Sequence, residues 1–146
     1  ITARQDAAVT RRFFAMCAEA KIDVQHILYD AADIAHLARL VAQGDVPCDG
    51  LKTLIVLGRY TNGQTSTPTE VAALAQRLKS ALPDADWAAC AFGPQETACL
   101  IETMRHGGKT RIGFENNRLN TDGQVAANNA ERVTELVTQA KRAGFA

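Results

Sequence analysis

The sequence lacks an excess of either charge and lacks any long hydrophobic run. Its 146 residues carry 16 basic and 16 acidic side chains, so the formal net charge is +0 and nothing favours nucleic acid or an anionic membrane as a partner. No apolar run approaches the roughly 20 residues that span a bilayer. The apolar segment of a signal peptide is also missing, because Arg4 and Asp6 interrupt the N-terminus. We therefore expect a cytoplasmic protein with no nucleic-acid or membrane partner.

Paired cysteines and nucleotide-binding motifs are missing as well. The four cysteines form no C-x-x-C pair, and none of the three histidines stands at zinc-finger spacing. We expect reduced thiols, three or four of them buried as small hydrophobic side chains. There is no G-x-G-x-x-G and no G-K-[ST], so a nucleotide-binding fold would lack its usual motif. The chain begins at Ile1 without Met, inside an expected helix, which indicates a fragment of a longer protein.

What the sequence does contain is a regular alternation of apolar strands and amphipathic helices. After a first helix over 7–20, we expect strands at 24–29, 54–57, 87–92 and 111–115, and helices at about 31–43, 68–82, 95–106 and 129–142. A helix after every strand requires parallel strands with right-handed crossovers. The sequence therefore predicts an α/β protein. Its four units are half of an eight-stranded barrel, which typically needs about 250 residues.

The most informative stretch is 111–117, which reads R-I-G-F-E-N-N. Strand alternation would place Arg111, Gly113 and Glu115 on one face. A positively charged side chain, a glycine and a negatively charged side chain would pack poorly in a hydrophobic core but are suited to line a binding site. α/β proteins place their chemistry at the C-terminal ends of strands, so we expect Arg111 and Glu115 to line an active site.

This stretch, with Asp122-Gly123 and the A-x-N-N-A sequence at 126–130, resembles the C-terminal segment of the beta-keto acid cleavage enzymes. Further upstream, Val56-Leu57-Gly58 resembles the sixth strand of those proteins, and Trp87 with Phe92-Gly93 resembles the seventh. The resemblance implies an α/β fold of the (β/α)8 TIM-barrel type. It covers nearly the whole chain but only the last four units, so residues 1–146 would be the C-terminal half of a barrel whose N-terminal half is absent.

The resemblance also implies a reaction and a metal. The family is zinc-dependent and joins a beta-keto acid to acetyl-CoA, which gives acetoacetate and a new acyl-CoA. Its zinc ligands are two histidines of an H-x-H motif early in the barrel and the glutamate of the last strand, here Glu115. The strand arginine, here Arg111, lies by the reacting carbonyls and would stabilise developing negative charge. This chain has no H-x-H, so the other ligands would lie in the absent half.

One position departs from the family pattern. Many members carry an aspartate, the proposed base, where this chain has Asn116, and an amide cannot take up a proton at neutral pH. We keep Asn116 as a candidate catalytic residue in a supporting role. In the loop after the second strand, Gly58, Arg59, Tyr60 and Asn62 are candidates for binding substrate or CoA, because backbone donors and an arginine suit phosphate or carboxylate.

Plainer explanations of these residues remain open. Glu115 and Arg111 would also be ordinary solvated charges, Asn116 a turn former, and the Gly58–Asn62 loop a mobile connection. Two other functions also remain: another metal-dependent barrel lyase or aldolase, and a non-catalytic half-barrel that acts as an assembly module. Half a barrel exposes strand edges and apolar helix faces, so we expect the isolated chain to form a homo-oligomer.

Overall fold

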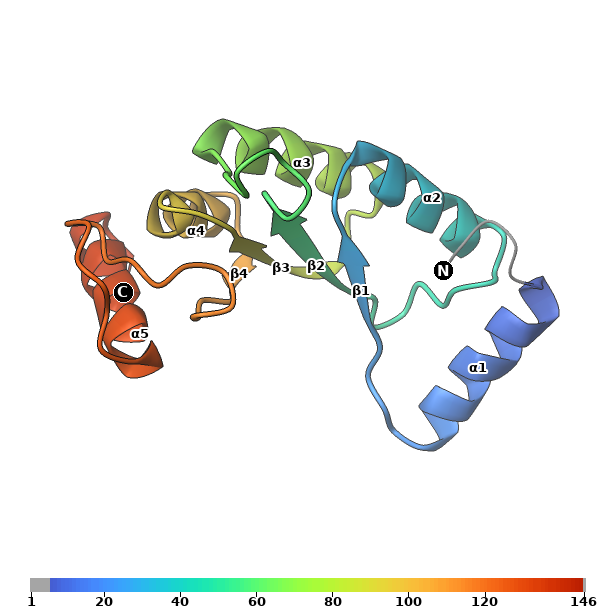
Figure 1. The fold of residues 1–146 in the computed structure, drawn as a ribbon. Helices are drawn as coiled ribbons and strands as arrows, with labels where there is room; N and C mark the ends of the chain where they lie inside the picture. The colour runs from blue at the N-terminus through green and yellow to red at the C-terminus, as the bar shows by residue number, and fades with distance from the viewer. Residues whose placement is uncertain (1–5, 146) are drawn as a thin grey trace.

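The computed structural model describes residues 6–145 and contains a parallel sheet with helices along one side (Figure 1). The strand order is β1-β2-β3-β4, and every neighbouring pair is parallel. The strands are β1 (Gln25–Leu28), β2 (Lys52–Leu57), β3 (Asp86–Ala91) and β4 (Lys109–Thr110); the helices are α1 (Ala7–Glu19), α2 (Ala31–Ala42), α3 (Pro68–Ala81), α4 (Glu96–Arg105) and α5 (Asn129–Arg142). This order confirms the predicted α/β class and is consistent with half of a barrel.

Local capping interactions determine where the helices begin. The Asp30 carboxylate accepts hydrogen bonds from the N–H groups of Ala32 and Asp33 in the first turn of α2, at 2.7 and 2.9 Å. Helix α3 starts with a capping box between Thr67 and Glu70, and Pro68 occupies its first turn, where its missing N–H is not needed. The side chain of Asn128 accepts from the Glu131 N–H and caps α5. These helices therefore begin within a residue or two of the expected positions.

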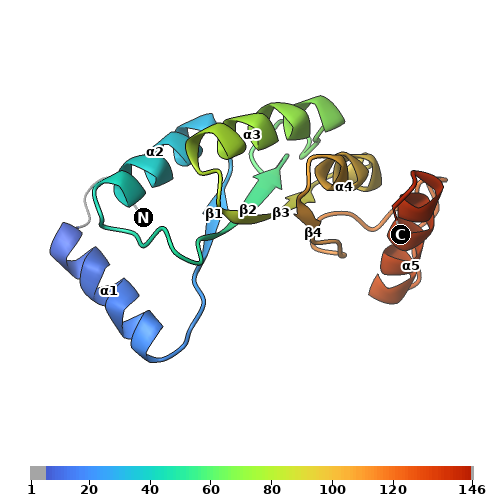
Figure 2. The same cartoon turned by 180° about the vertical axis from the view of Figure 1, so that it is seen from behind.

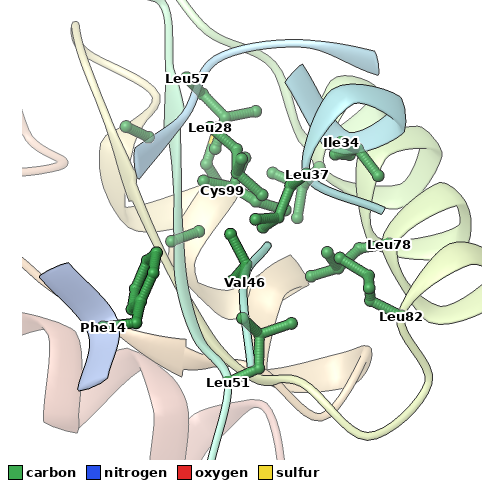
Figure 3. Close-up of a cluster of buried hydrophobic side chains, with 14 residues drawn as sticks. Phe14, Leu28, Ile34, Leu37, Val46, Leu51, Leu57, Leu78, Leu82 and Cys99 are labelled. Carbon is green, nitrogen blue, oxygen red and sulfur yellow. The ribbon is translucent and has the colours of Figure 1, made fainter. Parts of the chain in front are cut away.

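The main hydrophobic core lies between the sheet and the helices. Alternate residues of β2, Ile55 and Leu57, point toward the helices, whereas Leu54 and Val56 belong to a second cluster on the opposite face. Figure 3 shows the helix-side cluster, in which side chains of α2 and α3 meet those of the sheet and its loops; its labelled members include Ile34, Leu37, Val46, Leu51, Leu78 and Leu82. The second cluster contains Leu54, Val56, Cys90 and Phe92. Both faces of the central strands are thus apolar.

The helices follow an arc around the sheet. Helices α2, α3 and α4 lie over one face, while α1 and α5 lie beyond its two outer strands (Figures 1 and 2). Large apolar side chains of these two outlying helices are exposed; they are Val9, Phe13 and Met16 on α1 and Val133 and Val137 on α5. Within residues 6–145, no helix is long and apolar enough to cross a membrane.

Tight packing holds the last strand against its neighbour. A Cβ added at Gly108, just before β4, would lie 2.6 Å from ring carbons of Trp87 on β3 and 2.8 Å from the Thr103 methyl group. No side chain fits in this space. Gly108 therefore allows β4 to approach the indole closely.

Two expectations were wrong. The last strand was expected at 111–115, but β4 covers only Lys109 and Thr110. The Arg111 N–H still donates to the Ala89 carbonyl at 2.9 Å, and the chain then turns. The N–H groups of Asn116 and Asn117 both donate to the Gly113 carbonyl, at 2.9 and 3.3 Å, which defines a turn rather than a strand. The cysteines are also less buried than expected; Cys90 and Cys99 are buried, Cys17 is half-buried and Cys48 is exposed.

Candidate active site at the carboxyl edge of the sheet

The predicted site residues follow the C-terminal ends of β2 and β4. Since the strands are parallel, these ends lie at one edge of the sheet. Arg111 and Glu115 come together there: the Arg111 Nη2 is 3.4 Å from the Glu115 Oε2. They meet because the turn brings residues four apart together, not because a strand aligns them. The Glu115 side chain is 72% exposed, so its carboxylate is accessible.

Arg111 also contacts a thiol. Its Nη2 lies 3.4 Å from the Sγ of Cys90, on the β3 face opposite the helices. Burial raises the pKa of the Cys90 thiol, and the Arg111 guanidinium only partly offsets this effect. The thiol is therefore neutral near pH 7 and leaves the positive charge of Arg111 available for a ligand.

Asn116 has the opposite surroundings to its neighbour Glu115. It is only 7% exposed. Its carbonyl accepts from the Gly93 N–H at 3.2 Å, which ties the turn after β4 to the end of β3. Its Nδ2 has no hydrogen-bond partner among the described residues. The Asn116 amide also lowers the pKa of the Cys90 thiol against the effect of burial, so it lies beside the group that contacts Arg111.

Several backbone groups of the loop after β2 form hydrogen bonds with one hydroxyl group. Thr61 Oγ1 donates toward the carbonyls of Gly58 and Thr65, at 3.0 and 2.7 Å, and accepts from the Thr65 N–H at 2.9 Å. Gly58 has a φ of +77°, and a Cβ there would lie 2.9 Å from the Thr65 backbone. Asn62, in the middle of the loop, is exposed. Gly58 is thus required by the loop backbone itself.

Two candidate binding residues of this loop contact aromatic rings. The Arg59 guanidinium lies over the ring of Phe92, 5.3 Å from its centroid. The exposed ring of Tyr60 lies 4.8 Å from that of Tyr29, at the end of β1. The Ser66 hydroxyl donates to the Phe92 carbonyl at 2.7 Å and joins the loop to β3. The ends of β1, β2 and β3 therefore share one surface.

Two arginines flank the end of β3. Arg59 contacts Phe92, and Arg111 contacts Cys90, two residues earlier on the same face. Guanidinium groups suit carboxylates and phosphates, because their N–H donors form a fixed fork. This edge of the sheet is therefore suited to an anionic ligand.

The described residues do not make a complete metal site. Within residues 6–145, no three His, Cys, Asp or Glu side chains lie close enough together to hold a metal ion. The histidines have other contacts: His26 stacks on Phe14, His36 lies 3.0 Å from the Arg39 guanidinium, and His106 bonds Glu102. Glu115 is chemically suited to be one oxygen ligand, since its carboxylate is exposed and its ion pair with Arg111 is long.

Several residues that hold the turn in place were not predicted. Asn129 Oδ1 accepts from the Phe114 N–H at 2.8 Å, and a buried ion pair between Glu96 and Arg132 lies next to the turn. A signal for Arg132 exists in the sequence: it stands four residues before Leu136 and eight before Ala140, on the stripe of α5 that is buried.

A protein-family model matches the sequence of the chain. The family model described as beta-keto acid cleavage enzyme matches residues 2–146, nearly the whole chain. Members of this family are enzymes and are generally metal-dependent. The chain therefore belongs to the beta-keto acid cleavage enzyme family.

Proposed function

We propose that this chain supplies part of the active site of a zinc-dependent enzyme that condenses a beta-keto acid with acetyl-CoA and releases acetoacetate and a new acyl-CoA. The observation that carries the proposal is the contact between Arg111 and Glu115 at the carboxyl edge of the sheet, in a chain that belongs to this family. It joins an accessible metal-binding carboxylate to a cation that can stabilise an enolate or a tetrahedral oxyanion.

Residues 1–146 are, in this proposal, the C-terminal half of a (β/α)8 barrel. The arc of helices and the two open sheet edges support it. Apolar grooves lie beside both outer strands. The groove beside β1 is lined by Val9, Phe13, Val24, Ile27, Leu37 and Leu40; the groove beside β4 by Met104, Ile112, Val133, Leu136, Val137 and Phe145. Four further strands would fill both grooves and close the sheet.

Glu115 is the proposed zinc ligand of this half, and two histidines of the other half complete the set. Zinc, when bound, supplies Lewis-acid polarisation of the keto-acid carbonyl. Arg111 holds the reacting carbonyl oxygens and stabilises the charge that develops on them. The neutral thiol of Cys90 supports the guanidinium from the interior without cancelling its charge.

Asn116 has a donor role rather than a basic one. Its Nδ2 is buried in this chain, so the amide supports the Cys90 thiol and its contact with Arg111 from inside rather than acting on the substrate itself. Proton removal then falls to a different group, since an amide cannot accept the proton. Arg59, with Gly58, Tyr60 and Asn62 of the same loop, binds the anionic part of CoA or of the substrate.

The test is the substitution E115Q in the whole protein that contains this chain. We expect it to lower zinc content and turnover together, because glutamine keeps the shape of the side chain but removes the anionic ligand. Zinc is measured by elemental analysis and turnover by acetoacetate release. The control is D84N, which makes the same charge change at an exposed position on the opposite edge of the sheet. Wild-type zinc content in E115Q would overturn the assignment of the ligand.

A second candidate function is favoured by Asn116. Without the usual aspartate, the same site would suit another metal-assisted lyase or aldolase in which a different base acts on the substrate. Cleavage of a beta-keto acid or aldol substrate without acetyl-CoA would identify this alternative. Binding of substrate without any turnover would instead favour the non-catalytic assembly module.

A further inference from the structure

A completely buried ion pair lies next to the turn that carries Glu115 and Asn116. The Arg132 Nη2 is 2.8 Å from the Glu96 Oε2, and both side chains are 0% exposed. The same Nη2 lies 3.3 Å from the Thr97 hydroxyl. Removing two charges from water is costly, and buried pairs are often no more stabilising than apolar side chains of similar size. The presence of this pair therefore needs an explanation other than stability.

The pair is not the main apolar contact between the two helices. Glu96 is the first residue of α4, and Arg132 is in the first turn of α5. The apolar contact between α4 and α5 lies further along both helices; it includes Leu100, Ile101, Leu136 and Ala140. The pair instead lies at the helix ends that follow the carboxyl edge of the sheet. Its position relates it to the site rather than to the core.

Glu96 is linked to the turn through Gly93. The Glu96 N–H donates to the Gly93 carbonyl at 3.0 Å, and the Gly93 N–H donates to the Asn116 backbone carbonyl at 3.2 Å. Burial raises the pKa of Glu96, while Arg132, the Gly113 N–H and the Asn117 amide act in the opposite direction. The last two groups belong to the turn itself. The Glu96 Oε1 itself makes no hydrogen bond among the described residues. The carboxylate thus lies between Arg132 and the backbone of residues 113–117.

Arg132 extends the connection to the segment after the turn. Its Nη1 contacts the Asn120 Oδ1 at 3.1 Å and also pairs with Glu135. The Glu135 carboxylate accepts from both the N–H and the hydroxyl of Thr121, at 2.6 Å each. The segment after the turn is therefore held to α4 and α5 through the guanidinium group of Arg132.

We propose that Glu96 and Arg132 are positioning residues, and that their buried pair fixes the 113–117 turn on which Glu115 and Asn116 face the site. The pair orders the turn from behind, so the exposed carboxylate and the buried amide keep their relative orientation before any ligand binds. The role assigned to the turn rests on the proposed function, but the fixing of its geometry does not.

Hydrogen–deuterium exchange, read by mass spectrometry on the whole protein, tests this proposal. In the double variant E96M/R132M, apolar side chains of similar length replace the pair. We expect peptides that cover 112–118 to exchange roughly tenfold faster, while the middles of α4 and α5 exchange as in the wild type. The matched control is E102M/R105M, which removes the ion pair on the outer side of α4.

Two results would overturn the proposal. One is wild-type exchange in peptides of 112–118; the other is faster exchange along the whole of α4 and α5, which would show a purely structural pair. If E96M/R132M does not fold, E96Q is read by the same criteria, since it removes one charge and keeps the shape. The measurement needs no metal or substrate, so a wild-type protein without zinc would defeat the proposed function and leave this inference intact.

Discussion

Glu115 and Asn116 are consecutive residues with very different environments. The first is exposed and pairs loosely with Arg111, while the second is buried with unpartnered donors. A strand would produce such alternation too, but here a turn produces it, and the turn adds a contact between residues 111 and 115. The site therefore depends on the exact shape of a few residues rather than on the sheet.

His26 should make the stability of the chain depend on pH. It is half-buried and stacks on Phe14 with ring centroids 5.6 Å apart, and burial lowers its pKa from the usual 6.5. Below about pH 6.5 the unfolded chain then binds more protons than the native one, so the free energy of unfolding falls as the pH falls. Urea unfolding at about pH 7.5 and about pH 5.5 measures this loss.

The variant H26F keeps an aromatic ring against Phe14 and removes the titrating group. We expect it to lose part of the decline in stability between those two pH values. The control is Q25F, which adds the same ring at the exposed neighbouring position of β1, removes no titrating group and should retain the full decline. An unchanged pH dependence in H26F would show that His26 does not contribute.

At the scale of elements, the sequence predicts the helices well because their caps are local. Asp30 and Thr67 accept from N–H groups two or three residues away, and Pro68 occupies the first turn, so a sequence pattern is sufficient to find these helix starts. The end of β4 depends instead on distant partners, such as Asn129 bonding the Phe114 N–H. Similarly, Glu96 resembles an ordinary first-turn acid, and only the fold shows that it meets Arg132.

Substitution of Gly108 should weaken the docking of β4. In G108A the new Cβ would be 2.6 Å from the Trp87 ring, in a space bounded by rigid groups. We expect a loss of about 1–3 kcal/mol in the free energy of unfolding, as for other overpacked sites. Urea denaturation followed by circular dichroism measures it.

The control for this substitution is G107N. Gly107 has a φ of +80°, which asparagine tolerates better than other residues, and nothing lies within 4 Å of its Cβ position. G107N should be less damaging than G108A. Equal stability of G108A and the wild type would mean that the indole moves aside without cost.

At the scale of the whole molecule, the described residues hold four strands and five helices. A second copy placed to close the sheet would bring the total to eight strands and ten helices, two helices more than a (β/α)8 barrel holds. Two copies of this chain therefore fit a (β/α)8 barrel less well than one copy joined to a different half-barrel with fewer helices. The exposed apolar faces of α1 and α5 still favour association of the chain with itself.

We expect the isolated chain to be larger than a 15.7 kDa monomer when its mass is measured by light scattering. The variants F13D and V137D place a charge on the two apolar faces and should shift the population toward the monomer. S80D adds the same charge at an exposed position of α3 and should not. A monomeric unmodified chain would contradict the prediction.

The close contact between Trp87 and Gly108 also has a spectroscopic consequence. The chain has one tryptophan, so its entire indole emission comes from the point where the last strand meets the sheet. That strand leads directly into Arg111 and the 113–117 turn. Emission wavelength and quenching would therefore report, without any added dye, whether the segment that carries the candidate site is in place as partners, metal or substrate are added.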